Sequence, residues 1–332
     1  MLKLFQRNMV VQALLIVVAM LVLWGGSLLT PPAVEAAAHP GVLYAPVARW
    51  LTNLPRLAVV LTMLLVLAEA IWLNILLSSA GLVSQNSLLP TLLYLVAMSA
   101  GAATLTPLVF VGAALIACLD KLLLRGTLLT IPSSKACGAT MLIGIASLFY
   151  PPAVLFMLSY LLIAASYRLY NWRDWAVMIL GFAAPYLLLV LVLYLTDGLD
   201  AWWATTLNGL SNIGFHAGNA SSLSIVSGAL LAGVLLWGLF VTGGRLTERP
   251  VVWQKNATTV MLFLVGGIAL LLYMPLFPLG GLLAAMALPF TFCTYRLLTA
   301  GAETTTGFGR RRRKAWIYDL LLILILIAAL LC

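Results

Sequence analysis

The sequence predicts an all-α protein, a polytopic transmembrane helical bundle of ten or eleven spans that forms one integral-membrane domain over residues 1–332. Hydrophobic residues make up 64% of the chain and charged residues 8%, against about 25% charged residues in soluble domains. The apolar residues come in runs of about 20, the length that crosses a hydrocarbon core of about 30 Å. Basic residues separate alternate runs, which indicates that the chain crosses the membrane repeatedly.

Eleven apolar segments can be drawn as spans. Their approximate ranges are 9–29, 57–79, 88–106, 107–124, 136–150, 152–167, 175–196, 223–243, 257–275, 278–297 and 315–332. The fifth, sixth and last are short, so the count falls to ten if one of them does not cross fully. The first run resembles a secretory signal, but it exceeds the usual apolar length of about 7–15 residues, and we expect a retained first helix.

Lysine and arginine set the orientation, because they concentrate in the cytoplasmic loops of membrane proteins. With the N-terminus in the cytoplasm, 16 of the 18 basic residues lie on the inner side and only Arg49 and Arg56 lie outside. The inner residues are Lys3, Arg7, Lys121, Arg125, Lys135, Arg168, Arg173, Arg245, Arg249, Lys255, Arg296, Arg310, Arg311, Arg312, Arg313 and Lys314. We therefore expect a multi-pass protein of the bacterial inner (cytoplasmic) membrane.

Three connections between the predicted spans are long: two periplasmic segments at about 30–56 and 197–222, and a basic cytoplasmic loop at about 298–314. In the stretch 45–54, Val47, Trp50 and Leu51 share one face of a helix, which predicts a short helix lying in the membrane interface. The second periplasmic segment predicts another interfacial helix, followed by a tail rich in turn-forming Gly, Asn and Ser.

The composition argues against several classes of protein. The net charge of +9 is explained by topology and by attraction to anionic lipid headgroups, and no folded basic face with interleaved aromatics indicates nucleic acid. The four cysteines make no C-x-x-C pair, so we expect neither a disulfide framework nor a zinc site. Phosphate-cradling loops and nucleophile elbows do not occur in the sequence.

Three acidic residues on the periplasmic side, Glu35, Asp197 and Asp200, are the candidate catalytic residues. A carboxylate can act as general base for an acceptor hydroxyl. Carboxylates can also hold a divalent cation against a lipid phosphate, which makes such a cation the one cofactor this site would suggest. Asp197 and Asp200 would share a helical face at the i, i+3 spacing. The alternatives are that Asp197 lies at the N-cap of a helix, or that it marks a helix end at the wet side of a span.

Four further residues of the same side are candidate binding residues: His39, Trp202, Trp203 and His216. The tryptophan pair could stack on a sugar face, or it could anchor a helix at headgroup depth. The two histidines are equally consistent with ordinary loop residues. Together with the carboxylates, these side chains would form an outer-face constellation if the two periplasmic segments meet.

Glu69 lies in the middle of the second predicted span, in "VLAEAIWLN". Ionisable residues at bilayer depth are costly and mark substrate or proton sites by default. Glu69 is therefore a candidate binding residue. The alternative is a hydrogen bond to another helix that acts as structural glue.

The blocks "LLPTLLYLVAMS" and "LFYPPAVLFMLSYLLIAASYRLYNWRDWAVMILGFAAPYLLLVLVLYL" resemble an uncharacterised family of polytopic inner-membrane proteins from Bacteroidota, a family that implies no activity. At fold level the pattern is also similar to membrane glycosyltransferases that use polyprenyl-phosphate sugars. That resemblance implies a cytoplasmic N-terminus, interfacial helices and an acidic first periplasmic loop, in which Glu35 is the only acid that could fill the role.

Three functional hypotheses follow. A glycosyltransferase-like enzyme would handle a polyprenyl-linked sugar or lipid at the periplasmic face. A non-catalytic subunit or scaffold would bind other membrane proteins of the cell envelope. A secondary transporter would place Glu69 in a water-filled cavity, and the interrupted segments "GFAAPYLLL" and "AMALPFTF" are its candidate broken helices.

Overall fold

The computed structural model describes residues 9–32, 41–125, 130–167, 171–200, 202–203, 222–273, 280–303 and 311–331. These residues form an all-α bundle, as predicted, and no strand occurs among them. The main helices in chain order are α1 (Met9–Leu29), α2 (Tyr44–Thr52), α3 (Pro55–Ser79), α4 (Leu89–Ser99), α5 (Pro107–Leu122), α6 (Ser133–Phe149), α7 (Phe156–Ser166), α8 (Trp172–Leu195), α10 (Ser222–Gly243), α11 (Val251–Ala269), α12 (Gly280–Ala285), α13 (Ala287–Glu303) and α14 (Arg311–Leu331). Short 3-10 turns are η2 (Pro151–Leu155), η3 (Leu246–Glu248) and η4 (Leu270–Leu272).

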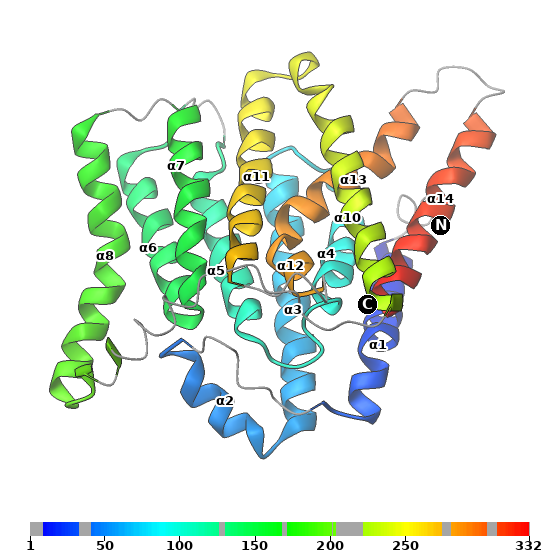
Figure 1. Ribbon diagram of the computed structural model, residues 1–332. Coiled ribbons are helices and arrows are strands. Elements are labelled where there is room, and N and C mark those ends of the chain that lie inside the picture. Colours follow the sequence, from blue (N-terminus) through cyan, green and yellow to red (C-terminus); the bar gives the residue numbers. More distant parts are fainter. Residues whose placement is uncertain are drawn as a thin grey trace.

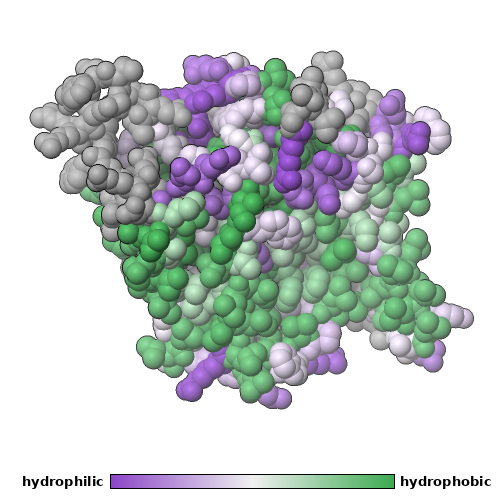
Figure 2. All heavy atoms as spheres, turned by 180° about the vertical axis from the view of Figure 1, so that it is seen from behind, coloured by the Kyte–Doolittle hydropathy of each residue, from purple (hydrophilic) through white to green (hydrophobic). Residues whose placement is uncertain are grey.

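Within the described residues, four helices are long and apolar enough to cross a membrane: α1, α3, α8 and α10. The protein is therefore a membrane protein of the helical type. The surface agrees with this. On the face drawn in Figure 2, hydrophobic side chains cover the middle and lower parts, and hydrophilic side chains lie along the upper edge and at a few places at the bottom. A wide apolar belt of this kind is what lipid contact requires.

The helices alternate in direction, so that from α3 onward the described residues next to the predicted cytoplasmic loops lie at one end of the bundle (Figure 1, top). We call this the basic end. The backbone of Leu124, after α5, exchanges two hydrogen bonds of 2.8 and 3.0 Å with the side chain of Asn256 on α11. Lys255 and Arg296 lie against the rings of Tyr167 and Trp253. These contacts bring four of the predicted basic segments together.

Helix α4 differs from its prediction, because residues 88–106 do not form one continuous span. The helix ends at Ser99, and residues 100–106 continue without helical structure. Pro107 starts α5, and the residue before it, Thr106, is extended (φ −103°, ψ 156°), as the proline ring requires. Nearly all of α4 is buried, so neighbouring helices shield it from lipid.

The predicted span 278–297 is also interrupted. α12 ends at Ala285 and α13 begins at Ala287, with a turn at Met286 between them. Pro289 is the cause, because a proline ring clashes with the carbonyl four residues earlier and offers no N–H to it. That carbonyl belongs to Ala285. In the first turn of α13 the same proline is well tolerated, because the N–H groups there lack helical partners.

Helix α2 confirms the predicted short helix at 45–54 and lies across the end of the bundle opposite the basic end (Figure 1). Its buried face consists of Tyr44 and Leu51, while Trp50 is 62% exposed. Only part of the expected apolar face therefore packs on protein. The exposed Trp50 is placed as an interfacial tryptophan would be.

Candidate functional site

Glu69 occupies the middle of α3, and its side chain is only 4% exposed. Its span is apolar on all sides, because α3 packs against α4 and α5 and also presents residues such as Leu64 and Ile75 to the surroundings. A carboxyl group in such a place costs free energy unless it is hydrogen-bonded or neutral. The question is which group it meets.

The hydroxyl of Tyr94 on α4 donates a hydrogen bond of 2.8 Å to Oε2 of Glu69. Tyr94 is fully buried, so both partners of this bond are removed from bulk water. Within the part of the chain that the structure describes, this is the one hydrogen bond of the Glu69 carboxylate. The pair joins the long span α3 to the short interior helix α4.

Gly112 of α5 faces the pair. A methyl group at this position would lie 2.8 Å from the Tyr94 hydroxyl oxygen and 3.1 Å from Glu69 Oε2. Both distances are too short for ordinary contact with a carbon atom. The sequence therefore needs glycine here, since any larger residue would push the Glu69–Tyr94 bond apart.

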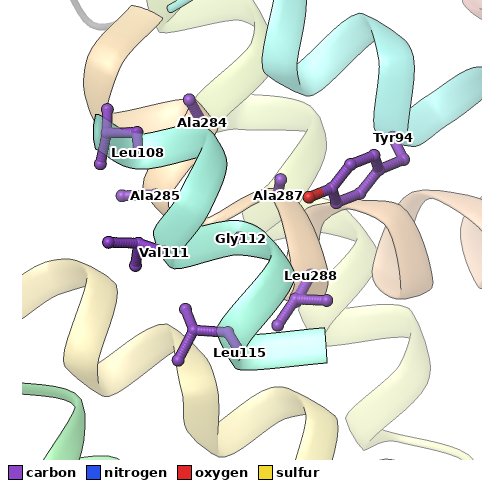
Figure 3. A pocket seen from close by; sticks show the side chains of 9 residues that line it. All are labelled: Tyr94, Leu108, Val111, Gly112, Leu115, Ala284, Ala285, Ala287 and Leu288. Carbon is purple, nitrogen blue, oxygen red and sulfur yellow. The ribbon is translucent and has the colours of Figure 1, made fainter. Parts of the chain in front are cut away.

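A cavity of about 10 Å³ lies beside Tyr94 and Gly112, the two residues nearest the Glu69 carboxylate, and it has about the room that one water needs. Its wall is formed by α4, α5 and the two sides of the α12–α13 break; the lining residues are Tyr94, Leu108, Val111, Gly112, Leu115, Ala284, Ala285, Ala287 and Leu288. Figure 3 shows the Tyr94 hydroxyl pointing toward Gly112 and Ala287. Apart from that hydroxyl, the lining side chains are aliphatic or absent.

The end of α4 meets the start of α12 at a close backbone crossing. A methyl group on Gly101 would overlap the Gly280 carbonyl, and one on Gly280 would overlap the Ala100 carbonyl. Glycine at both positions allows the two backbones to touch. The two interrupted segments are therefore neighbours, and the cavity lies next to their crossing.

Side chains from two other helices satisfy the irregular backbone after α4. Trp24 on α1 donates to the Ala102 carbonyl at 3.0 Å, and Tyr44 on α2 donates to the Leu105 carbonyl at 2.6 Å. Burial raises the pKa of the Tyr44 phenol, which keeps it a donor. Non-helical backbone within a membrane needs such partners, because lipid offers none.

Glu69 is predicted from the sequence, but Tyr94, Gly112 and the alanines of the α12–α13 break are not. The sequence does indicate the break itself, because "AMALPFTF" contains the proline that interrupts the helix. Tyr94 gave no signal of its own, since a tyrosine in an apolar run is unremarkable. Only packing shows that it stands opposite Glu69.

Asp197 has a structural role at the end of α8. Its φ of 52° lies in the left-handed region, which aspartate tolerates better than most residues. Its N–H donates to the Tyr194 carbonyl at 3.4 Å, and Gly198 N–H donates to the Leu193 carbonyl at 3.0 Å. These two bonds are those of a Schellman helix end. The alternative that Asp197 marks a helix end therefore agrees with the backbone.

The expectation that Asp197 and Asp200 share one helical face is wrong, because the left-handed turn at Asp197 separates α8 from the helical residues that follow it. Helical backbone resumes at 199–200 and 202–203. Asp197 and Asp200 are both exposed. The rings of Trp202 and Trp203 lie 6.0 Å apart, and Trp203 is 55% exposed, as expected of a pair that anchors a helix at the interface.

Glu35, His39 and His216 lie outside the described residues, so the structure does not place them relative to the aspartates. Among the residues that it does place, no group of three or more His, Cys, Asp or Glu side chains could hold a metal ion. The described carboxylate with the most unusual surroundings is therefore Glu69. No protein-family model, curated protein or solved structure matches this chain.

Proposed function

We propose that the protein is a secondary transporter of the bacterial inner membrane, and that Glu69, Tyr94 and the adjoining cavity form its binding site. The observation that carries the proposal is a hydrogen-bonded carboxyl group beside a cavity lined by an interrupted helix. Ionisable residues inside a membrane mark ion and substrate pathways by default.

The position of the helix breaks supports transport over the other functions considered. Binding sites of secondary transporters lie at discontinuous helices near the middle of the membrane. Here the end of α4 and the α12–α13 break meet at the Gly101–Gly280 crossing, and the cavity adjoins both. Helices interrupted in this way can change their relative positions with little loss of backbone hydrogen bonding.

The small size of the cavity has a mechanistic consequence. At about 10 Å³ it admits about one water molecule, so a solute could enter only after α5 and the α12–α13 segment separate. The facing residues Gly112, Ala284, Ala285 and Ala287 are small, which lets these elements approach closely and move apart without interlocked side chains. The described conformation would be the closed one of an alternating-access cycle.

The proposal is tested with purified protein in proteoliposomes that contain a pH-sensitive dye. A panel of amino acids, sugars, organic anions and amines is added outside, and solute-dependent changes of internal pH are recorded. We expect at least one class to produce a signal, and we expect Glu69→Gln to abolish it while Asp200→Asn leaves it unchanged. A signal that survives in Glu69→Gln at the wild-type rate would refute the assigned site.

A second candidate function is the glycosyltransferase-like enzyme at the periplasmic face. One observation favours it. The backbone N–H groups of Gly41 and Leu43 donate to the Phe149 and Leu148 carbonyls at 3.1 and 3.3 Å, so the segment just after His39 adjoins the end of α6. α6 is the main partner of α8, and Asp197 lies two residues after the end of α8. Loss of polyprenyl-phosphate sugar turnover in both Glu35→Gln and Asp200→Asn would support this enzyme over the transporter.

A further inference from the structure

We propose that the ion exchanged at Glu69 is a proton, supplied by water in the cavity at Gly112, and not sodium or another metal cation. This inference rests on the proposed function of the site. It follows from the number and kind of polar atoms that the structure places around the carboxylate.

A metal cation needs more oxygen ligands than the site offers. Hard cations bind about six oxygens from carboxylates, carbonyls and water. Around the cavity, the polar side-chain atoms among the described lining residues are limited to the Tyr94 hydroxyl, and its hydrogen is directed at Glu69 Oε2. Besides the carboxylate, a cation beside Glu69 would meet this O–H donor, at most the one carbonyl oxygen of Ala285, and otherwise aliphatic groups, which is fewer than six ligands. A proton needs only one oxygen and a water to carry it.

No other charged group of the described neighbourhood competes for the role. α1 and α12 carry no titratable side chain. On α5 the nearest is Cys118, and on α13 it is Cys293. These lie six and five residues beyond the cavity-lining Gly112 and Leu288, or about 9 and about 7.5 Å along the two helices. The other titratable side chains described on these helices, Asp120, Lys121, Tyr295 and Arg296, lie still nearer the basic end. Tyr44 and Arg49 of α2 and Arg56 of α3 lie at the opposite end.

The α12–α13 break provides a place for the water. Pro289 has no N–H for the carbonyl of Ala285, and Ala285 lines the cavity. A water that reaches this carbonyl would have a polar partner in addition to the Tyr94 hydroxyl. Gly112 keeps the space open, since a methyl group would lie 3.1 Å from Glu69 Oε2.

The exchange step is a simple proton transfer. A hydronium ion in the cavity gives one proton to a carboxylate oxygen of Glu69, which leaves a water molecule and a neutral carboxyl group. Tyr94 keeps its own proton throughout, and its O–H continues to donate to the carboxyl oxygen. Release to the other side of the membrane reverses the step after the cavity opens there.

Infrared difference spectroscopy on protein in lipid nanodiscs tests this directly, without any solute. A pH titration should reveal the carbonyl band of one protonated carboxyl group that shifts in D₂O and is lost in Glu69→Gln. Tyr94→Phe should shift the band, because it removes the hydrogen bond. Gly112→Ala should do the same, whereas Gly233→Ala, where a methyl group meets nothing within 4 Å, should not.

The ion is then identified by competition. At fixed pH, sodium, lithium, potassium and choline chloride should leave the band unchanged. A band that sodium or lithium removes would overturn the inference, as would a Glu69 band that does not respond to pH. If Glu69→Gln does not fold, the band can still be assigned to Glu69, because the band of a protonated carboxyl group shifts in D₂O and because Tyr94→Phe should shift it as well. If the infrared band shows proton binding but no solute is transported in the proteoliposome panel, the proposed transport function would be contradicted. The assignment of the bound ion as a proton would still hold.

Discussion

Asp197 and Glu69 are both acidic residues of a membrane protein, but their surroundings assign them different roles. Asp197 is exposed and adopts the left-handed conformation that ends α8. Glu69 is 4% exposed and is hydrogen-bonded to Tyr94. Water and backbone geometry explain the first residue without any ligand. The second needs a function to justify the free energy of placing a carboxyl group at that depth.

The helix end at Asp197 gives a prediction for stability. Asp197→Gly should preserve or raise the thermal midpoint in detergent, because glycine adopts a positive φ freely. Asp197→Val should lower the free energy of unfolding by about 1–2 kcal/mol, since a branched side chain is strained there. Asp200→Val is the control, because residue 200 has helical backbone. Equal midpoints for the Gly and Val variants of Asp197 would contradict this account.

The crossing of α4 and α12 is the feature of greatest consequence among the elements. Two segments that the sequence predicts as full spans are each interrupted, one before Pro107 and one before Pro289. Trp24 and Tyr44 satisfy carbonyls of the irregular backbone between α4 and α5. The glycines at 101 and 280 let the two interrupted segments touch, and this contact places the cavity.

A pair of glycine substitutions tests the crossing. Gly101→Ala should destabilise the fold by about 1–3 kcal/mol, because its methyl group would overlap the Gly280 carbonyl and overpacking costs this much. Gly25→Ala on α1, where a methyl group meets nothing within 4 Å, should instead stabilise its helix by about 0.5–1 kcal/mol. Thermal midpoints in detergent should move in opposite directions. A neutral Gly101→Ala would show that the crossing is not tight in solution.

For the whole molecule, the described residues next to the predicted cytoplasmic loops lie at the basic end from α3 onward, and α2 and the end of α8 lie at the other (Figure 1). Hydrophobic side chains lie between (Figure 2). The positive-inside rule predicts an orientation with the basic end in the cytoplasm. α8 packs chiefly against α6 at one side of the molecule, and most of its apolar residues are exposed, which is expected of a helix that faces lipid.

Labelling of single cysteines tests this orientation. In a variant whose four native cysteines are replaced by serine or alanine, Asp200→Cys should react with a membrane-impermeant maleimide added outside intact spheroplasts. Thr247→Cys, also at an exposed position, should react only after the membrane is opened. Asp200 follows the end of α8, whereas Thr247 lies in η3, after α10. Labelling of both from outside, or of Thr247→Cys alone, would reverse or refute the topology.

Much of the fold could be predicted from local sequence. Apolar runs, prolines and the distribution of lysine and arginine depend only on neighbouring residues, and they predicted the helical class, the order of the helices and their alternate directions. The same local rules predicted α2. They did not show that residues 100–106 leave the helix, because an apolar run has the same composition whether it spans the membrane or stops halfway inside other helices.

The candidate site divides in the same way. Glu69 was identifiable from sequence because a carboxylate in an apolar span is costly wherever the span packs. The sequence does not assign Tyr94, Gly112 and Ala285 to the site, since none of them is unusual in its own apolar segment. They become part of a site only because α4, α5 and α12 come together in the fold. The sequence by itself determined which residues enter the membrane and which end is basic, because both depend on transfer from water. Only the tertiary structure decided which buried groups face one another, because that depends on where the helices break and how closely their backbones approach.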